Sequence, residues 1–368
     1  MTTMIRVLQV VTYMGRGGIE TMLMNYYRKI DRSIIQFDFL VHRDFKGDFD
    51  DEILSMGGKI YHVPRYNPFS FEYRRKVRDF FEKHKEYKIV HSHINSMSGI
   101  VLKEAARSEV PVRIAHSHCE GFEKSIKVPI KKMFIPQISK NATAFMACSD
   151  AAGKFLFGKD KQFVVLPNAI EVEKFKYNEL TREKFRKEFS VSDDTIVLGH
   201  VGRFFGQKNH AFLIDIFQEV IKKKKAKLLL VGDGELKSEI KKRVDENHIS
   251  ENVIFAGVRS DVPELMQAMD IFVFPSLFEG LGVAAVEAQA AGLPTVISDC
   301  IPSEVIISKD LVSVLSLDQS PEEWANHILS RIGVKRTDHS YEIIENGYDA
   351  TVNAKWLTEY YQTRLSEI

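Results

Sequence analysis

The stretch FPSLFEGLGVAAVEAQAAGLP, residues 274–294, decides the fold of the chain around it. A short apolar run ends at Pro275, as a buried strand would, and a glycine-containing turn precedes a helix-forming run rich in alanine. That run stops at Gly292-Leu293-Pro294, which is a helix-end signal. The order strand, glycine loop, helix leaves amide groups and the positive end of the helix dipole free to receive a phosphate.

Two glutamates bracket the start of this helix. Glu279 stands before it and Glu287 within it, and eight residues that are mostly helical, at ~1.5 Å each, would set the carboxylates roughly 12 Å apart. Glutamates on a helix ordinarily face solvent, but small apolar residues surround Glu287 on nearly every side. A carboxylate buried there needs a partner, because an unpaired one is costly. The pair could therefore hold two ends of one extended ligand.

The pattern E-G-L-G-V-x-x-V-E-A-x-A-x-G-L-P, from Glu279 to Pro294, resembles the signature of the large family of retaining, nucleotide-sugar-dependent glycosyltransferases. This family includes many bacterial capsule and exopolysaccharide enzymes. The resemblance covers essentially the whole chain and is most specific over residues 199–210 and 255–294. It implies the GT-B fold, an α/β architecture of two doubly wound, Rossmann-like domains with the active site in the interdomain cleft.

Length, net charge and cysteine content limit the class of protein to which the chain can belong. At 368 residues the chain is long enough for two separate cores, since single cores stop growing near ~250 to 300 residues. A net charge of +1 gives no electrostatic case for binding nucleic acid, so we expect no nucleic-acid partner. The three cysteines lack CxxC spacing, which indicates neither a disulfide framework nor a cysteine zinc site and fits a reducing cytoplasm. The apolar run near the N-terminus is too short to span a membrane and lacks a signal-peptide cleavage pattern.

Strand-like and helix-like segments alternate along the chain, which is typical of a parallel sheet covered by helices on both faces. The alternation begins with a strand at 5–11 and a helix at 20–30, and it restarts at Thr195 with TIVLGHVGR. Between the two runs, the polar, charge-mixed segment 171–194 has the composition of a linker. The expected domains are an N-terminal Rossmann-like acceptor domain over 1–170, a C-terminal Rossmann-like nucleotide-sugar donor domain over 171–348, and a C-terminal helix over 349–368 that packs back on the N-terminal domain.

That last helix carries an aromatic stripe of Trp356, Tyr360 and Tyr361 beside Leu357. In the resembled family the terminal helix crosses back to the first domain, which implies that this stripe is buried there.

VGRFFGQKNH, residues 201–210, is the second informative stretch. Arg203 and Lys208 flank a turn containing Gly206, between a buried strand and a helix, where two fixed cations could clamp a diphosphate. Basic residues are ordinarily solvated surface, but this stretch resembles the family's G-R-x-x-x-x-K-N motif, which implies phosphate binding. The two cations would stabilise charge that builds on the leaving diphosphate in the transition state.

The resemblance also implies which residues bind each part of a UDP-sugar donor. In FAGVRSDVPELM, residues 255–266, backbone groups of Val258 and Arg259 would lie near the uracil base. Glu287 would take the ribose hydroxyls, and Glu279 would take hydroxyls of the sugar. Further donor contacts would come from the backbone of Gly280, Leu281, Gly282 and Val283.

In the first domain, MGRGGIE resembles the family's glycine loop, in which Gly17 and Gly18 let the backbone approach the donor and the acceptor. A glycine cluster by itself is weak evidence, because glycines simply make turns. RIAHSHCE places His116 and His118 at another strand end, where the family carries a histidine close to the transferred sugar. His116 is the first choice for this catalytic position and His118 the second.

His91 and His93 end the preceding strand, so four histidines are expected at one edge of the sheet. Such a group suggests a metal site. We nevertheless expect no metal, because no carboxylate cluster accompanies the histidines and the resembled family generally works without one. Hydrogen-bonded histidines, or histidines that line an acceptor pocket, are the alternatives that we favour.

KSIKVPIKKMFIPQISK, residues 124–140, interleaves lysines with bulky apolar residues. This pattern could rest on an anionic bilayer, which would give peripheral membrane contact through 124–135 at the inner face of the cell membrane. The alternative is an amphipathic helix that faces its own core. Pro129 and Pro136 speak against one long helix. The lysines concerned are Lys124, Lys127, Lys131 and Lys132.

These observations predict a cytoplasmic, retaining glycosyltransferase that moves a hexose or N-acetylhexosamine from a UDP-sugar to a glycan or lipid-linked acceptor. A UDP-sugar epimerase of the same fold and a non-catalytic nucleotide-sugar-binding protein remain as alternatives. A glycoside hydrolase with Glu279 and Glu287 as its carboxylate pair is disfavoured, because ~12 Å exceeds the ~5 to 9.5 Å separation that such chemistry needs.

Overall fold

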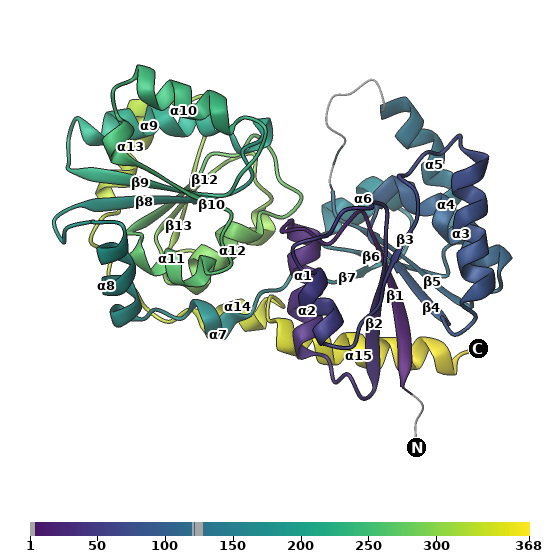
Figure 1. The fold of residues 1–368 in the computed structure, drawn as a ribbon. Helices are drawn as coiled ribbons and strands as arrows, with labels where there is room; N and C mark the ends of the chain where they lie inside the picture. The colour runs from purple at the N-terminus through teal and green to yellow at the C-terminus, as the bar shows by residue number, and fades with distance from the viewer. Residues whose placement is uncertain (1–3, 120, 122–127) are drawn as a thin grey trace. The chain divides into compact units, whose positions relative to one another are not determined.

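The computed structural model describes residues 4–119, 121 and 128–368, and they form two compact units. The first unit combines the chain up to Ile170 with Asp349–Ile368, and the second spans Glu171–Tyr348. Each unit is built on one sheet whose strand pairs are all parallel (Figure 1). The expectation of an α/β protein with two doubly wound, Rossmann-like units is thereby confirmed.

The sheet of the first unit has the strand order β3-β2-β1-β4-β5-β6-β7. The order reverses beside β1, which pairs with β2 on one side and β4 on the other, and ligands of such sheets bind at the carboxyl ends of the strands near this point. Its strands are β1 (Ile5–Val11), β2 (Ile35–Val41), β3 (Ile60–His62), β4 (Ile89–Ser92), β5 (Val112–Ser117), β6 (Ala144–Ala147) and β7 (Val164–Val165).

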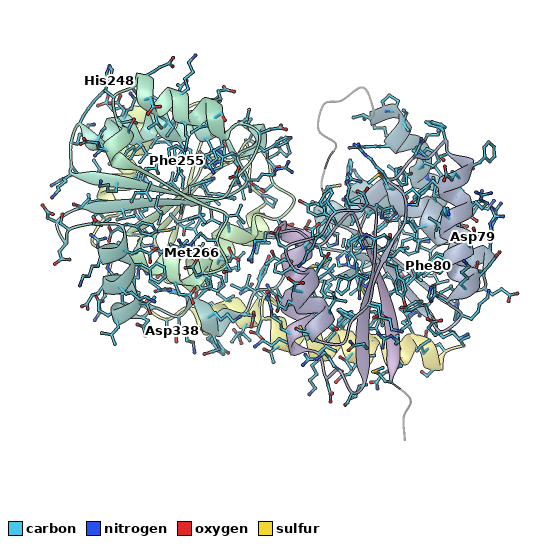
Figure 2. All side chains as sticks on the ribbon, in the orientation of Figure 1. Asp79, Phe80, His248, Phe255, Met266 and Asp338 are labelled. Atoms are coloured by element: carbon cyan, nitrogen blue, oxygen red, sulfur yellow. The ribbon has the colours of Figure 1, made fainter. Side chains whose placement is uncertain are left out.

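Helices cover both faces of this sheet and create two core layers. Alternate residues of β1 point to opposite faces, so Val7 enters the layer under α1, α2 and α15, whereas Leu8 enters the layer under α3 to α6. Figure 2 labels Phe80 of α3, which lies in the second layer. The helices are α1 (Gly18–Lys29), α2 (Asp50–Ser55), α3 (Phe71–Lys83), the short η1 (Asn95–Met97), α4 (Ser98–Arg107), α5 (Val128–Asn141), α6 (Asp150–Phe157) and α15 (Ala350–Ser366).

Helix α15 lies against α1 in the first unit, although it follows the whole second unit in sequence. Asp349 caps its N-terminus by accepting hydrogen bonds from the amides of Thr351 and Val352. Only part of the expected aromatic stripe is buried. Tyr361 is fully buried, whereas Trp356 is 36% exposed, because the face that α15 turns to the core is narrower than the stripe.

The second unit has the strand order β10-β9-β8-β11-β12-β13, and its reversal point lies between β8 and β11. Helices α9, α10 and α13 pack on one face, and α8, α11 and α12 lie on the other (Figure 1). The strands are β8 (Ile196–Val201), β9 (Ala226–Val231), β10 (Val253–Gly257), β11 (Ile271–Phe274), β12 (Thr295–Ser298) and β13 (Val312–Leu315). The helices are α7 (Val172–Phe175), α8 (Glu179–Glu188), α9 (His210–Ile221), α10 (Lys237–Glu246), α11 (Val262–Ala268), α12 (Val283–Ala290), α13 (Pro321–Ser330) and α14 (Ser340–Glu345).

The interpretation of residues 171–194 as a linker is wrong. This segment forms α7 and α8 and belongs to the second unit, where α8 packs on α11. Arg182 and Arg186 of α8 both form ion pairs with Asp270, at 2.6 and 3.2 Å. The segment is polar because α8 docks through arginines as well as through apolar side chains, so its composition does not distinguish it from a linker.

Helix α5 also departs from the expectation, because it runs through both prolines without a break. Pro129 lies in its first turn, where no amide donor is needed, and Pro136 lies inside the helix. Phe134 and Ile138 are buried, while Met133 is 55% exposed, so this part of the helix faces its own core on one side only. Lys124 and Lys127 lie outside the described residues. None of the helices in the described ranges is long and apolar enough to cross a membrane.

Candidate functional site

The start of α12 is shaped to leave backbone donors available. Strand β11 ends at Phe274, a loop carries the chain to Gly282, and α12 begins at Val283. Gly282 has φ +83°, a left-handed conformation that glycine adopts without steric cost, and this residue is the N-cap of the helix. It offers no side chain to cap the first amides of α12. The first turn can therefore donate to an anion.

Glu279 in this loop is bound to the loop that follows β8. Its Oε1 accepts a hydrogen bond of 2.6 Å from Lys208 Nζ, and its Oε2 accepts one of 3.0 Å from Gln207 Nε2. The amide of Leu277 donates to the carbonyl of Gln207 at 2.8 Å, so the two loops are joined through backbone as well as side chains. Lys208 closes the short η2 helix (Gly206–Lys208) and also lies 4.5 Å from the ring centre of Phe274.

Glu287 is half-buried on α12, and its carboxyl group has no hydrogen-bond or ion-pair partner within the part of the chain that the structure describes. Burial raises its pKa to about 7, and the positive charge of Lys208 opposes this rise. Lys208 thus acts electrostatically on Glu287 while it is paired with Glu279. The premise that most residues between the two glutamates are helical holds only from Val283 onward, so ~12 Å along one helix does not describe their separation.

Arg203 lies in the same loop as Lys208 but differs in environment. Its side chain is exposed, and its guanidinium lies 5.5 Å from the ring centre of Phe205. No ion-pair partner for Arg203 occurs among the described residues. The structure therefore gathers Lys208, Glu279 and Glu287 around one point and leaves Arg203 as a free cation at the rim of the loop.

Val258 and Arg259 follow β10, at the same edge of the sheet. Gly257 has φ +72° and turns the chain, and Val258 is 53% exposed. The guanidinium of Arg259 is engaged by Asp261 at 2.6 Å and by Glu188 at 3.3 Å. These carboxylates raise its pKa further above the ordinary range. A ligand would thus meet the backbone here, with the Arg259 side chain already occupied.

Two buried histidines near Lys208 were not predicted from the sequence. His200 on β8 binds the carbonyl of Val273 through Nδ1, and His210 begins α9 and stacks on Phe204. His200 Nε2 and both ring nitrogens of His210 have no partner among the described residues. Burial lowers the pKa of both, to about 4 for His210, so they are neutral beside the lysine. The motif VGRFFGQKNH ends in His210, which was the available signal.

In the first unit, Gly17 is the N-cap of α1 and Gly18 is its first residue. Neither adopts a left-handed conformation, and a Cβ on Gly18 would meet no atom of the described residues within 4 Å. A Cβ on Gly17 would meet only the mobile end of the Glu20 side chain, at 2.3 Å. Nothing in the local fold therefore requires glycine here. Glu20, which the sequence interpretation passed over, lies over this loop, and burial raises its pKa to about 7.

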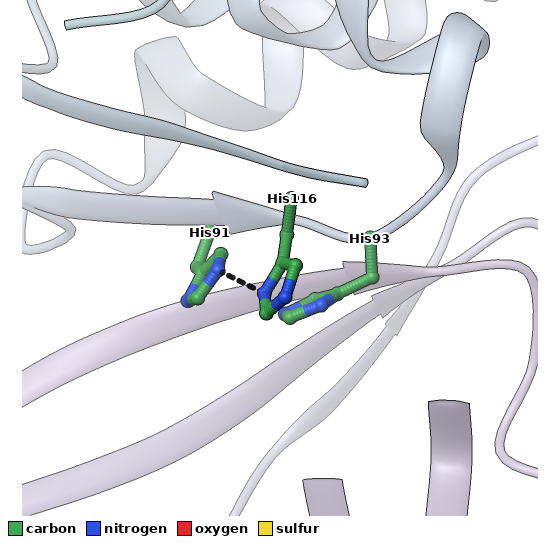
Figure 3. Close-up of side chains that lie close together, drawn as sticks. All are labelled: His91, His93 and His116. Carbon is green, nitrogen blue, oxygen red and sulfur yellow. Dashed lines mark hydrogen bonds between the residues drawn. The ribbon is translucent and has the colours of Figure 1, made fainter. Parts of the chain in front are cut away.

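Four histidines gather at the carboxyl ends of β4 and β5, as expected, and they form one hydrogen-bonded network with two arms. Figure 3 shows three of them, His91, His93 and His116, with the hydrogen bond between His91 and His116. In the first arm His116 Nδ1 lies 3.1 Å from His91 Nε2, and His91 Nδ1 lies 2.7 Å from the hydroxyl of Tyr361 on α15. In the second arm His118 Nε2 lies 2.9 Å from His93 Nδ1. The side chain of Gln9 joins the arms.

Gln9 on β1 gives the network a direction, because its amide has one donating and one accepting end. Its Nε2 donates to Tyr361 at 3.3 Å, and its Oε1 accepts from His93 Nε2 at 2.9 Å. Burial lowers the pKa of all four histidines, to about 3 for His118 and well below the ordinary value for the other three. Each ring is therefore neutral and carries one proton.

Because each ring carries one proton, the direction of the Gln9 amide determines which ring nitrogen of each histidine is protonated. It thereby sets the protonation of the nitrogens at the outer ends of the two arms, His116 Nε2 and His118 Nδ1. His116 Nε2 becomes a donor and His118 Nδ1 an acceptor, and turning the Gln9 amide over reverses both ends together. Both nitrogens are buried and have no hydrogen-bond partner of ordinary geometry among the described residues, although an interaction with the Asn168 side chain raises the pKa of His118 against the effect of burial. The pair thus offers one donor and one acceptor, which is the complement of hydroxyl groups.

The same network bears on metal binding. Ring nitrogens of His91, His93 and His116 lie within 4.8 Å of one another, which would suit three ligands of one ion. Both nitrogens of His91 and both of His93 are already used in hydrogen bonds. In a second cluster, Asp310, His339 and Glu342, both ring nitrogens of His339 are likewise used, one by Thr337 and the other by Glu342. Either site would have to give up these bonds to hold a metal.

Comparison with family models gives two matches along the chain. Residues 16–174 match the model described as Glycosyltransferase Family 4, and residues 195–332 match the model described as Glycosyl transferases group 1. The second match contains both η2 and α12, and the first contains Gly17, Gly18 and all four histidines of the network.

Among similar proteins, EpsF of Bacillus subtilis (strain 168), whose name carries a provisional assignment as a glycosyltransferase, is 38% identical over 97% of this chain and 96% of its own length. An Escherichia coli enzyme named UDP-Gal:alpha-D-GlcNAc-diphosphoundecaprenol alpha-1,3-galactosyltransferase is 30% identical over 59% of each chain. The crystal structure of Anabaena HepE in complex with UDP-glucose superposes with a TM-score of 0.82 at 18% identity, covering 97% of this chain and 99% of that one.

Proposed function

The chain belongs to the group 1 glycosyltransferases, and from this premise we propose that it transfers a hexose or N-acetylhexosamine from a UDP-sugar to an acceptor hydroxyl, with retention of anomeric configuration, in polysaccharide synthesis. The choice of UDP is supported by the Escherichia coli relative, whose name specifies UDP-Gal, and by HepE, which was solved with UDP-glucose. Each name describes that protein, and both are consistent with the site of this chain.

The observation that carries the proposal is the unpartnered Glu287 beside the Lys208–Glu279 pair at the start of α12. A half-buried carboxyl group without a partner is costly, and vicinal ribose hydroxyls would satisfy both of its oxygens. The free amides of α12 and the cations Arg203 and Lys208 would then lie along the diphosphate. Glu279, which already positions Lys208, would keep further lone pairs for hydroxyls of the sugar.

The uracil base would lie at Val258 and Arg259 and be read by their backbone. The Arg259 side chain is held by Asp261 and Glu188, which favours backbone recognition over a contact through the guanidinium. We propose that no metal or other cofactor takes part, with Arg203, Lys208 and helix amides neutralising the diphosphate instead.

In the first unit, Gly17 and Gly18 would let donor and acceptor approach the backbone, since local structure gives no other reason for two glycines. His116 Nε2, the free end of one network arm, would hydrogen-bond a hydroxyl of the transferred sugar. His118 remains the second choice for this role.

In the proposed reaction the acceptor oxygen bonds to the anomeric carbon as the bond from that carbon to the diphosphate oxygen breaks. The acceptor attacks on the side of the leaving group, and the departing diphosphate oxygen takes the acceptor proton. Arg203 and Lys208 supply the main electrostatic stabilisation of the diphosphate.

The acceptor is proposed to be a glycan or lipid-linked saccharide, reached in the cytoplasm at the inner face of the membrane through residues 124–135. The exposed Met133 and Ile130 of α5 support such contact. Each exposed lysine near an anionic bilayer contributes ~1 kcal/mol, so binding should be weak and sensitive to salt. Replacing Lys131 and Lys132 by Glu should reduce sedimentation with anionic vesicles, and absence of sedimentation by the wild type would contradict the membrane contact.

The test is calorimetric binding of UDP and, separately, of ADP and GDP, followed by assay of UDP release from a panel of UDP-sugars. We expect UDP to bind more tightly than ADP or GDP and to be released slowly from one UDP-sugar even without acceptor. Conversion into an epimeric UDP-sugar would favour the epimerase, and UDP binding with no release in the presence of any acceptor would favour the sugar-nucleotide-binding protein.

A further inference from the structure

A pocket of about 780 Å³ lies in the first unit, and none of its lining residues belongs to the site described above. It opens at the carboxyl ends of β1 and β2, where Thr12 follows the first strand and Arg43 follows soon after the second. The loop after β3, residues 94–97 after β4, and helix α5 complete its wall. Its volume lies within the range of small-ligand sites, and its place at the strand ends is where open α/β sheets bind ligands.

The lining is positively charged. Arg43, Arg65 and Lys131 line the pocket, and no aspartate or glutamate of the described residues does so. Arg65 is exposed, and neither arginine has an ion-pair partner in the described ranges; Arg43 donates to the carbonyl of His42. His42 adds no charge, because burial lowers its pKa to about 4 and two hydrogen bonds hold its ring. Neither guanidinium group is paired with a carboxylate of the described residues, so both keep donors for an anion.

Part of the wall is apolar and partly exposed. Phe69 is 60% exposed, although its loop is fixed by a hydrogen bond from its own amide to the Asn67 side chain and by one from Arg74 to the carbonyl of Pro68. Its ring meets Phe134 of α5 edge-on, with 6.2 Å between centroids. Ile130 of α5 is 37% exposed beside it. A bulky aromatic side chain held in an exposed position beside a pocket indicates an apolar ligand.

We propose that this pocket binds a phosphate or diphosphate group carried on an apolar chain, which is the head of a lipid-linked acceptor. The arginines would hold the anionic group, and Phe69, Ile130 and Phe134 would cover the first part of the chain. A neutral glycan would leave the arginines unused, and a free phosphate would leave the apolar wall exposed. The inference rests on the proposed transferase function and specifies the class of acceptor that it uses.

The test is calorimetric binding of three probes to the full chain below the micelle-forming concentration. The probes are farnesyl diphosphate, inorganic diphosphate and farnesol. We expect farnesyl diphosphate to bind at least about tenfold more tightly than either of the others, since it alone uses both parts of the pocket. Equal affinity for inorganic diphosphate would overturn the lipid component, and equal affinity for farnesol would overturn the anionic component.

Matched variants assign the binding to this pocket. Arg65→Ala should weaken farnesyl diphosphate and inorganic diphosphate alike, by about fivefold or more, whereas Phe69→Ser should weaken only farnesyl diphosphate. Arg75→Ala and Phe71→Ser are the controls, because both residues are exposed on α3 and neither lines the pocket. Unchanged binding by Arg65→Ala and Phe69→Ser, or equal losses in the controls, would overturn the assignment.

Binding of UDP is measured on the same variants. It should stay at the wild-type value, because Glu287 and Lys208 belong to the other unit. Failure of the farnesyl diphosphate arm with normal UDP binding would reject the acceptor pocket alone, and failure of UDP binding by the wild type would reject the proposed function.

Discussion

Lys208 Nζ lies 2.6 Å from Glu279 Oε1, and both side chains are mostly buried, with 16% and 6% of their surfaces exposed. The cation that we expect to face a diphosphate is therefore already paired with the carboxylate that we expect to face the sugar. Because a low-dielectric setting strengthens such a pair, each residue fixes the position of the other. The orientation of either side chain therefore depends on the other.

The first prediction concerns the two cations. Replacing them together, Arg203→Ala with Lys208→Ala, should lower turnover by at least ~10²-fold, the scale of losing one preorganised donor to the transition state. Turnover is measured as UDP released from the preferred UDP-sugar. Lys224→Ala, in an exposed run at the end of α9, is the matched control and should leave turnover unchanged. Near-normal turnover of the double variant would contradict the diphosphate assignment.

The second prediction separates the two glutamates. Glu287→Ala should weaken UDP and the UDP-sugar to a similar degree, because both ligands contain ribose. Glu279→Ala should weaken the UDP-sugar much more than UDP, because only the former presents sugar hydroxyls. Calorimetry with both ligands measures the two ratios. The opposite pattern would mean that the roles of the two residues are exchanged.

The third prediction is a dependence of UDP-sugar binding on pH. Burial raises the pKa of Glu287 to about 7 in the free protein, and ribose hydroxyls bind its ionised form best, so the bound ligand should lower this pKa. Binding then releases a proton, and affinity should rise from about pH 5.5 to about 7.5 and level off above it. The diphosphate of a UDP-sugar is a diester with no proton to lose in this range. Glu287→Gln should flatten the profile, and affinity that falls as pH rises would contradict the assignment.

Local sequence patterns were sufficient to place the site residues that lie near glycines and strand ends. The apolar run before Pro275, the glycines after it and the alanine-rich helix place Glu279, Gly282 and Glu287 within one strand-loop-helix unit, because each element has its own local signal. The pairing of Glu279 with Lys208 joins residues 71 positions apart, and nothing in either motif specifies the contact. It follows from β8 and β11 being neighbours in the sheet.

Local composition misled at two places for physical reasons. Helix α8 is polar because Arg182 and Arg186 form ion pairs with Asp270. Its composition alone is therefore the same as that of a linker. Its N-cap, Asn178, accepts a hydrogen bond from the amide of Thr181 and was a usable signal for a helix. The partners of the histidines could not be foreseen either, since Tyr361 lies 270 positions from His91 in the chain.

The fourth prediction concerns the histidine network. Tyr361→Phe removes the hydroxyl that joins Gln9 to His91, so the tautomer of His116 should no longer be coupled to that of His118. Nitrogen-15 NMR of labelled histidines measures both tautomers directly.

In the wild type, one of the two outward nitrogens should carry a proton and the other should not. Tyr360→Phe is the control, since Tyr360 lies on the same helix and forms no hydrogen bond of its side chain with the described residues. Two outward nitrogens in the same protonation state would contradict the coupling of the arms through Gln9.

Proton NMR of the sugar released when the wild-type protein hydrolyses its preferred UDP-sugar, recorded before the anomers equilibrate, tests the central claim most directly. A retaining transferase that uses UDP-sugars should release UDP together with the α-anomer first, and the Arg203→Ala, Lys208→Ala double variant should release neither at a comparable rate. Release of the β-anomer first, or consumption of the UDP-sugar without any release of UDP, would contradict the account.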